Sequence, residues 1–225
     1  VIESSLKSFG LGSATGIDVT PESPGLVPSR DWKRRNFSNP GDQVWYPGET
    51  VITGIGQGYM LTTPLQLAHA TAAVAMRGER WQPSLVRGIR DPVTGAIATR
   101  KPVALPRVEA SEANWDVIID SMIGVMRDPR GTARAVGLNS PWPIAGKSGT
   151  AQVFSVGQDE RYEEEELEER MRDHALVIAF APVEEPRIAV AVIVENGGSG
   201  SGVAAPIARR VIETYLEEQR LEASR

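Results

Sequence analysis

The residues with the clearest chemical potential are four neighbours: Lys147, Ser148, Gly149 and Thr150. Together they supply a cation, two hydroxyls and a residue without a side chain. A cation and hydroxyls can hold a carboxylate, a glycine lets a ligand approach closely, and a backbone N–H can stabilise a developing oxyanion. The Ala-Gln-Val-Phe that follows is typical of a strand. We therefore expect one extended strand that carries the groups which carboxylate binding and oxyanion stabilisation require.

Nucleotide binding is the main alternative for the same residues, because Gly146-Lys147-Ser148 resembles part of a phosphate-binding loop. That pattern needs a glycine five residues before Gly146 and a helix that starts at the lysine. Position 141 is Pro141, and strand residues follow Ser148. The sequence therefore disfavours a phosphate-binding loop. The glycines at 54, 56 and 58 do not have dinucleotide-loop spacing either, and they predict a tight turn.

Two further strands are predicted after the first, which gives an antiparallel sheet. The predicted strands are 144–154, 176–181 and 188–194, and the last two are joined by a Pro-Val-Glu-Glu-Pro segment suited to a hairpin loop. After the glycine-rich segment 197–202, a closing helix carries Ile207, Val211, Ile212, Tyr215 and Leu216. An antiparallel sheet flanked by helices places the chain in the α+β class.

Two earlier helices are indicated by their caps and apolar spacing. Thr63, Pro64 and Gln66 predict a helix start with a capping box, and Gly78 predicts its end. We expect this helix to be a core helix, with an apolar face that comprises Leu65, Ala68, Ala72, Ala75 and Met76. The second helix begins at Ser111 and ends at Pro129 and Gly131, with one face formed by Trp115, Ile118, Ile119, Met122 and Met126.

The segment 8–58 is rich in Gly, Pro, Ser and Asn, and we expect it to be mostly irregular. Short strand-like pieces are predicted at 16–19 and 50–53. Asp91, Pro92, Thr94 and Gly95 predict a hairpin turn.

An ordered set of motifs makes the lysine-serine-glycine strand much more specific than it is alone. In chain order the motifs are Phe9-Gly10-Leu11-Gly12, Thr15-Gly16-Ile17-Asp18, Gly54-Ile55-Gly56-Gln57-Gly58-Tyr59, Thr63-Pro64-Leu65-Gln66, Gly131-Thr132-Ala133, Lys147-Ser148-Gly149-Thr150-Ala151-Gln152 and Arg172-Asp173-His174. This set resembles the class B penicillin-binding proteins, specifically their elongation-specific group, penicillin-binding protein 2. The resemblance covers essentially the whole chain from Phe9 to the final helix.

The resemblance implies a fold of the β-lactamase and D,D-peptidase type and a D,D-transpeptidase activity. Such an enzyme cross-links peptidoglycan: a serine attacks a D-Ala-D-Ala stem peptide, expels D-Ala and passes the acyl group to an amine, and β-lactams mimic the donor. Lys147 would position the donor carboxylate, Ser148 and Thr150 would donate hydrogen bonds, and the Thr150 N–H would complete an oxyanion hole. No cofactor or metal is implied.

The resemblance also implies a location and partners. Enzymes of this group are anchored in the bacterial inner membrane and face the periplasm. The expected partners are a RodA-type glycosyltransferase, a MreC-type scaffold and the remainder of the same transpeptidase domain.

Two family motifs are not convincingly present. The family uses Ser-x-x-Lys and Ser-x-Asn before the lysine-serine-glycine strand. Ser4-Ser5-Leu6-Lys7 fits the first pattern, but it directly precedes Phe9-Gly10-Leu11-Gly12, which in the family follows both motifs; no Ser-x-Asn occurs. We interpret Ser4 and Lys7 as a coincidence. Residues 1–225, which do not begin with Met, are expected to be an excised C-terminal portion of a single transpeptidase domain, inactive alone.

Composition excludes several other functions. A formal charge of −5, with scattered arginines, argues against a nucleic-acid partner, and the absence of cysteine removes disulfides and thiolate chemistry.

We expect His69 to be a buried or hydrogen-bonded structural histidine. Asp173 and His174 are expected to orient the loop after the lysine-serine-glycine strand, and the acidic run 163–169 to form a solvated helix.

One alternative from another functional class stays open: a non-catalytic penicillin-sensing domain with the same fold. A membrane anchor and pedestal domain elsewhere in the protein would favour the enzyme. Fusion to a signalling module would favour the sensor.

Overall fold

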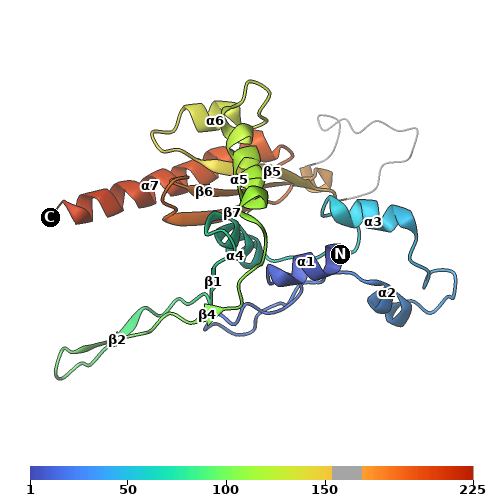
Figure 1. Cartoon of the computed structure of the whole chain (residues 1–225), viewed down its shortest axis with the longest axis horizontal. Helices are drawn as coiled ribbons and strands as arrows, with labels where there is room; N and C mark the ends of the chain where they lie inside the picture. Colours follow the sequence, from blue (N-terminus) through green and yellow to red (C-terminus); the bar gives the residue numbers. More distant parts are fainter. Residues whose placement is uncertain (154–168, 225) are drawn as a thin grey trace. The chain divides into compact units, whose positions relative to one another are not determined.

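The computed structural model describes residues 1–153 and 169–224, and the chain divides into two compact units. The first unit comprises 1–73 and 78–109, and the second comprises 74–77 and 110–225. Helices and antiparallel strands both occur, so the predicted α+β class is confirmed (Figure 1). Among the described residues, no helix combines the length and the apolar character that crossing a membrane requires.

The second unit is built on a sheet whose described strands follow the order β5-β6-β7. The strands are β5 (Ala145–Ala151), β6 (His174–Ala181) and β7 (Ile188–Val194), and both pairings are antiparallel. They confirm the three predicted strands, although β5 is shorter than the predicted 144–154: Ile144, Gln152 and Val153 lie outside the strand, and Phe154 lies outside the described residues. A connection with Pro182 and Pro186 joins β6 to β7, as the composition of that segment predicted.

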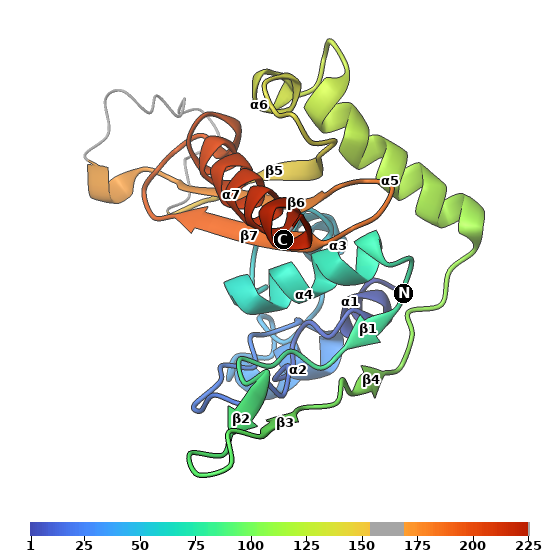
Figure 2. The same ribbon diagram turned by 90° about the vertical axis from the view of Figure 1, so that its left-hand side faces the viewer.

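Opposite faces of this sheet pack against different helices. Alternate residues of β6, such as Ala175, Val177 and Ala179, share a core with Ala208 and Ile212 of α7 (Ala205–Ala223), which lies across the sheet in Figure 2. Ala145 and Phe180, on the other face, pack with Ile119 and Met122 of α5 (Glu112–Arg127). The period of two residues in a strand is what separates these two cores.

Helix α5 follows its predicted start and end. The hydroxyl of Ser111 accepts a hydrogen bond from the Asn114 N–H at 3.3 Å and caps the helix. Trp115, Ile119, Met122 and Met126 are buried as predicted, whereas Ile118 is 39% exposed. A turn leads into the short helix α6 (Arg134–Leu138).

The buried face of α7 includes only some of the apolar residues that were named for this helix from the sequence. Ile207, Val211 and Tyr215 are exposed, while Ala205, Ala208, Ile212 and Leu216 are buried. Alanines allow a close approach of the helix to the sheet, so small residues rather than the larger aliphatic ones form much of this contact. A π-helical turn, η3 (Gly200–Ala204), precedes α7, and a short 3-10 helix, η2 (Glu169–Met171), precedes β6.

The first unit consists of short elements. They are α1 (Ile2–Ser8), α2 (Arg30–Asn36), α3 (Pro47–Gly54), most of α4 (Pro64–Ala75), and the strand pairs β1 (Arg80–Trp81) with β4 (Ala104–Leu105) and β2 (Gly88–Arg90) with β3 (Ile97–Thr99). The predicted hairpin turn connects β2 and β3, and the Asp91 carboxylate accepts from the N–H groups of Val93 and Thr94 at 2.8 and 2.7 Å.

The prediction of a strand at 50–53 is wrong, because these residues belong to α3. Pro47 occupies the first turn, and the Glu49 carboxylate accepts a hydrogen bond from the Tyr46 N–H at 2.7 Å. Proline and a back-bonded glutamate both stabilise a helix start. They override the β-propensity of Val51 and Ile52. No strand forms at 16–19 either, so that prediction is also wrong.

Helix α4 has the predicted capping box but a different buried face. The Gln66 side chain accepts from the Thr63 N–H at 3.0 Å, and the Thr63 hydroxyl accepts from the Gln66 N–H at 3.1 Å. The buried residues are Gln66, His69, Thr71 and Ala73, whereas Met76 is exposed. The buried polar groups are satisfied: the Gln66 amide donates to two backbone carbonyls, both at 2.8 Å.

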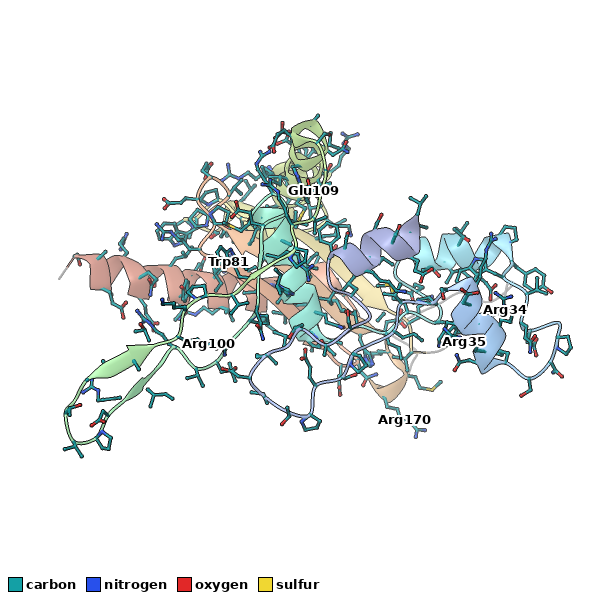
Figure 3. The ribbon with its side chains drawn as sticks, turned by 60° about the horizontal axis from the view of Figure 1, so that its bottom comes forward. Arg34, Arg35, Trp81, Arg100, Glu109 and Arg170 are labelled. Atoms are coloured by element: carbon teal, nitrogen blue, oxygen red, sulfur yellow. The ribbon has the colours of Figure 1, made fainter. Side chains whose placement is uncertain are left out.

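Asp18 holds the stem of the β2–β3 hairpin. Its carboxylate accepts from the N–H of Leu85 at 2.8 Å and of Val86 at 3.1 Å, and from the Ser84 hydroxyl at 2.8 Å. Arg100, seen near the stem in Figure 3, adds an ion pair at 2.8 Å. These hydrogen bonds hold the pKa of Asp18 well below its usual value.

Candidate functional site

Lys147, Ser148, Gly149 and Thr150 lie consecutively in β5, as the sequence predicted. They pair in register with Ile178, Val177, Leu176 and Ala175 of β6. Lys147 and Thr150 are exposed, and Ser148 and Gly149 are half-buried. Because Lys147 lies inside an extended strand and no helix starts there, the phosphate-binding loop is excluded.

The start of this strand is fixed against α5. A Cβ at Gly146 would lie 2.4 Å from the Met126 Cε and 2.8 Å from the Ile178 carbonyl oxygen. Distances this short leave no room for a side chain. Gly146 therefore lets β5 pass directly beside α5, which positions the following Lys147.

The ammonium group of Lys147 is held close to its own strand. It donates to the carbonyl of Ser148 at 2.5 Å. No carboxylate of the described residues lies within ion-pair distance of Lys147. The exposed cation is thus placed to meet an anionic ligand at the surface of β5.

Ser148 has a partner that the sequence reasoning did not include among the site residues. The hydroxyls of Thr132 and Ser148 are 3.0 Å apart, within hydrogen-bond distance. Thr132 lies within the Gly131-Thr132-Ala133 motif, which signalled the family but gave no contact. The two residues are separated by 16 positions, so only the fold brings them together.

Gly149 is backed by the η3 turn. A Cβ at Gly200 would lie 2.4 Å from the carbonyl oxygen of Gly149 and 2.5 Å from that of Leu176. The Ser199 hydroxyl caps this turn by accepting from the Gly202 N–H at 3.0 Å. The glycine-rich segment therefore packs directly on the backbone of β5 and β6.

Asp173 contacts the residues after β5, whereas His174 contacts those after β7. The Asp173 carboxylate accepts from the Val153 N–H at 3.2 Å, and Nδ1 of His174 accepts from the Asn196 N–H at 2.9 Å. The Asp173 contact fits the expected role of orienting the segment after β5, and the His174 contact is a structural one elsewhere, at the end of β7. Most of the acidic run 163–169 lies outside the described residues. Within the described part of the chain, no group of three His, Cys, Asp or Glu residues is placed to bind a metal ion.

Ser4 and Lys7 do not form a pair in α1. The Ser4 hydroxyl donates to the Val1 carbonyl at 2.8 Å, and the Lys7 ammonium donates to the Glu3 carboxylate at 2.6 Å. Both side chains thus have other partners, which favours the interpretation of Ser4-x-x-Lys7 as a coincidence.

The first unit also contains a hollow of about 680 Å³, lined in part by Arg34, Trp45 and Thr50. None of the residues 147–150 lines it. The lysine-serine-glycine strand is the stronger candidate site, because the Thr132 and Ser148 hydroxyls are within hydrogen-bond distance there and Gly146 and Gly200 allow close packing around it.

An α+β fold is combined here with a strand that carries Lys147, Ser148, Gly149 and Thr150. Residues 2–213 match the family described as "Penicillin binding protein transpeptidase domain", and the chain belongs to this family.

Within this family, the chain is similar to curated proteins named peptidoglycan D,D-transpeptidase MrdA. The chain is 37% identical over 215 residues to the peptidoglycan D,D-transpeptidase MrdA of Haemophilus influenzae, covering 95% of this chain and 32% of the relative. It is 40% identical over 212 residues to MrdA of Acinetobacter baumannii, covering 94% of this chain and 30% of the relative. The chain thus spans about a third of the length of these relatives.

The chain is also similar to solved structures of penicillin-binding proteins. A crystal structure of Pseudomonas aeruginosa PBP2 in complex with WCK 5153 matches with a TM-score of 0.77 and 44% identity, covering 95% of this chain and 43% of the other. A complex between PBP2 and MreC from Helicobacter pylori matches with a TM-score of 0.75 and 27% identity, covering 96% and 35%. The resemblance to the penicillin-binding protein 2 group is confirmed.

Proposed function

We propose that the protein containing this chain is a peptidoglycan D,D-transpeptidase and that residues 147–150 bind its donor peptide. The observation that carries the proposal is the strand β5 itself. It places an exposed ammonium, two hydroxyls and a glycine in sequence, on a backbone that α5 and η3 both approach closely. Relatives named as D,D-transpeptidases support the enzyme over the penicillin-sensing alternative.

Each residue has a distinct role in the proposed reaction. Lys147 attracts the carboxylate of the D-Ala-D-Ala donor, and the hydroxyls of Ser148 and Thr150 donate hydrogen bonds to it. Gly149 allows the donor to lie close to the backbone. The Thr150 N–H stabilises the oxyanion that forms when a serine attacks the scissile carbonyl.

The attacking serine lies outside residues 1–225 in this proposal. The chain contains no Ser-x-Asn, and Ser4 and Lys7 have other partners. Its match to about a third of each curated relative leaves ample length for the catalytic motifs. Residues 1–225 then form the C-terminal portion of one transpeptidase domain, together with a remainder that carries the nucleophile.

The location and partners follow the same reasoning. We propose a protein anchored in the bacterial inner membrane, with this domain in the periplasm, where β-lactams reach it and form a stable acyl-enzyme. A MreC-type scaffold is proposed as a partner because a similar protein was solved in complex with MreC. A RodA-type glycosyltransferase is proposed to supply the glycan strands that the enzyme cross-links.

Acylation of the full-length protein by a fluorescent penicillin tests the site. Lys147→Ala should raise the acylation barrier by about 2–4 kcal/mol, the effect of losing one electrostatic contact in such a site. Lys101→Ala, which removes an exposed lysine after the β2–β3 hairpin, is the matched control and should react like the unmodified protein. Normal acylation of Lys147→Ala would refute the assignment of this strand.

A further inference from the structure

Thr132 is an exposed residue between two neighbours that are fixed against α5. A Cβ on Gly131 would lie 2.4 Å from the Gly124 carbonyl oxygen and 2.5 Å from that of Val125. Ala133 is 2% exposed, and its N–H donates to the Val125 carbonyl at 3.1 Å. The backbone at Thr132 is therefore held rigidly, although its side chain reaches solvent.

The exposed hydroxyl of Thr132 lies at 3.0 Å from that of Ser148. A hydroxyl has one proton to donate and two lone pairs that accept. If the Ser148 oxygen accepts a hydrogen bond from the Thr132 hydroxyl, the Ser148 O–H is free to donate to a ligand. If Ser148 donated to Thr132 instead, it would have no proton left for a carboxylate. An anionic ligand therefore selects the arrangement in which Thr132 donates.

We propose that Thr132 is a positioning residue, which orients the Ser148 hydroxyl so that its proton points to the carboxylate of the donor peptide or β-lactam. This inference rests on the proposed function. Thr132 acts through Ser148 and does not itself touch the ligand.

A purely structural role for the hydroxyl pair fits the geometry less well. Thr132 is exposed and Ser148 is only half-buried, so water can replace the hydrogen bond in the folded protein. Exposed hydrogen bonds of this kind add little to stability. Rigid support for an exposed hydroxyl is what a preorganised binding site requires.

A double-mutant cycle on the full-length protein tests the inference. Thr132→Val removes the hydroxyl at nearly constant shape, Thr132→Ser keeps it, and Ser148→Ala removes the group that Thr132 is proposed to orient. The second-order rate constant of acylation by benzylpenicillin should fall about tenfold in Thr132→Val, which is the effect of weakening one hydrogen bond to a charged group. It should stay within about twofold in Thr132→Ser.

The cycle separates positioning from other roles. In the Ser148→Ala background, Thr132→Val should have almost no further effect, because the group it orients is gone. The methyl ester of the penicillin, which lacks the carboxylate, should react equally with the unmodified protein and Thr132→Val. Thermal unfolding of Thr132→Val should be unchanged, which a stabilising role would not allow.

Three results would overturn the inference. An undiminished rate in Thr132→Val shows that the hydroxyl has no role. An undiminished effect of Thr132→Val in the Ser148→Ala background shows that Thr132 does not act through Ser148. An unmodified protein that does not react at all overturns the proposed function and this inference with it, whereas a reactive protein whose Lys147→Ala variant is slowed leaves the proposed function standing.

Discussion

Gly200 lies against the backbone of Gly149, so closely that a Cβ on Gly200 would be 2.4 Å from the Gly149 carbonyl oxygen. The Gly149 carbonyl oxygen is a backbone atom, so it cannot move aside as the end of a flexible side chain could. The η3 turn and the strand proposed to bind the donor peptide are therefore packed backbone to backbone. Any side chain at position 200 must displace one of them.

Gly200→Ala should consequently damage both stability and the site. We expect the free energy of unfolding to fall by about 1–3 kcal/mol, the usual range for an overpacked interior. Acylation by penicillin should slow, because β5 must shift. Thermal unfolding and acylation kinetics measure the two effects.

Gly202→Ala is the matched control for that substitution. A Cβ at Gly202 would meet only side-chain atoms of Ser199, at 3.1 and 3.4 Å. It should change both quantities much less than Gly200→Ala. Equal behaviour of the two variants would contradict the packing of η3 on β5.

Asp18→Asn should loosen the stem of the β2–β3 hairpin. The carboxylate accepts from the backbone N–H groups of Leu85 and Val86, and its pKa is depressed in the folded state. A depressed pKa means that the contribution to stability is present above the ordinary aspartate pKa of about 4 and is lost as the pH falls below it. Hydrogen exchange of the Leu85 and Val86 amides should be faster in the variant at neutral pH.

The same measurement at acidic pH provides the contrast. After correction for intrinsic exchange rates, protection in the unmodified protein should decline below about pH 4, while the variant should show little of this dependence. Asp42→Asn, at an exposed loop position, should leave the hairpin amides unchanged. Unaltered protection in Asp18→Asn would show that Asp18 does not hold the hairpin.

His69 should make the first unit sensitive to mild acid. Burial, reinforced by the positive charge of Arg80, lowers the pKa of His69 in the folded state. The imidazole is therefore neutral in the fold, with Nε2 at 3.0 Å from the Trp81 carbonyl (Trp81 is labelled in Figure 3). As the pH falls below the ordinary histidine pKa of about 6.5, the unfolded state binds a proton more readily and stability declines.

Chemical unfolding between about pH 7.5 and pH 5.5 measures this effect, since that range brackets the ordinary histidine pKa. The free energy of unfolding should decrease toward acid in the unmodified protein. His69→Gln should be less stable at neutral pH but should show a weaker dependence on pH. A variant with the same pH dependence as the unmodified protein would contradict a neutral, buried His69.

Local signals in the sequence predicted the structure well where they concern neighbouring residues. The capping box of Thr63 and Gln66 forms as predicted, and so does the Ser111 cap of α5. The three predicted strands also form among the described residues: β6 and β7 arise from apolar runs bounded by turn residues, and β5 from a segment that the sequence indicated to be extended. Such features depend on contacts within a few positions of the chain.

Features that depend on distant residues were missed. Apolar spacing predicted that α4 buries the face with Leu65, Ala68, Ala72, Ala75 and Met76. Gln66 is buried instead, because the distant carbonyls of Ser13 and Pro24 accept hydrogen bonds from its amide. The contact of Thr132 with Ser148 likewise required the return of the chain from α5 to β5. The order of the motifs indicated the family, but it gave no distance between them.

Intact-mass spectrometry after incubation with a penicillin tests the central claim most directly. The full-length protein and residues 1–225 are treated separately, and the site of any adduct is mapped by peptide analysis. We expect one adduct on the full-length protein, at a serine outside residues 1–225, with slower formation in Lys147→Ala, and none on residues 1–225 alone. An adduct at Ser4 or another serine within residues 1–225 would contradict the account, as would the absence of any adduct on the full-length protein.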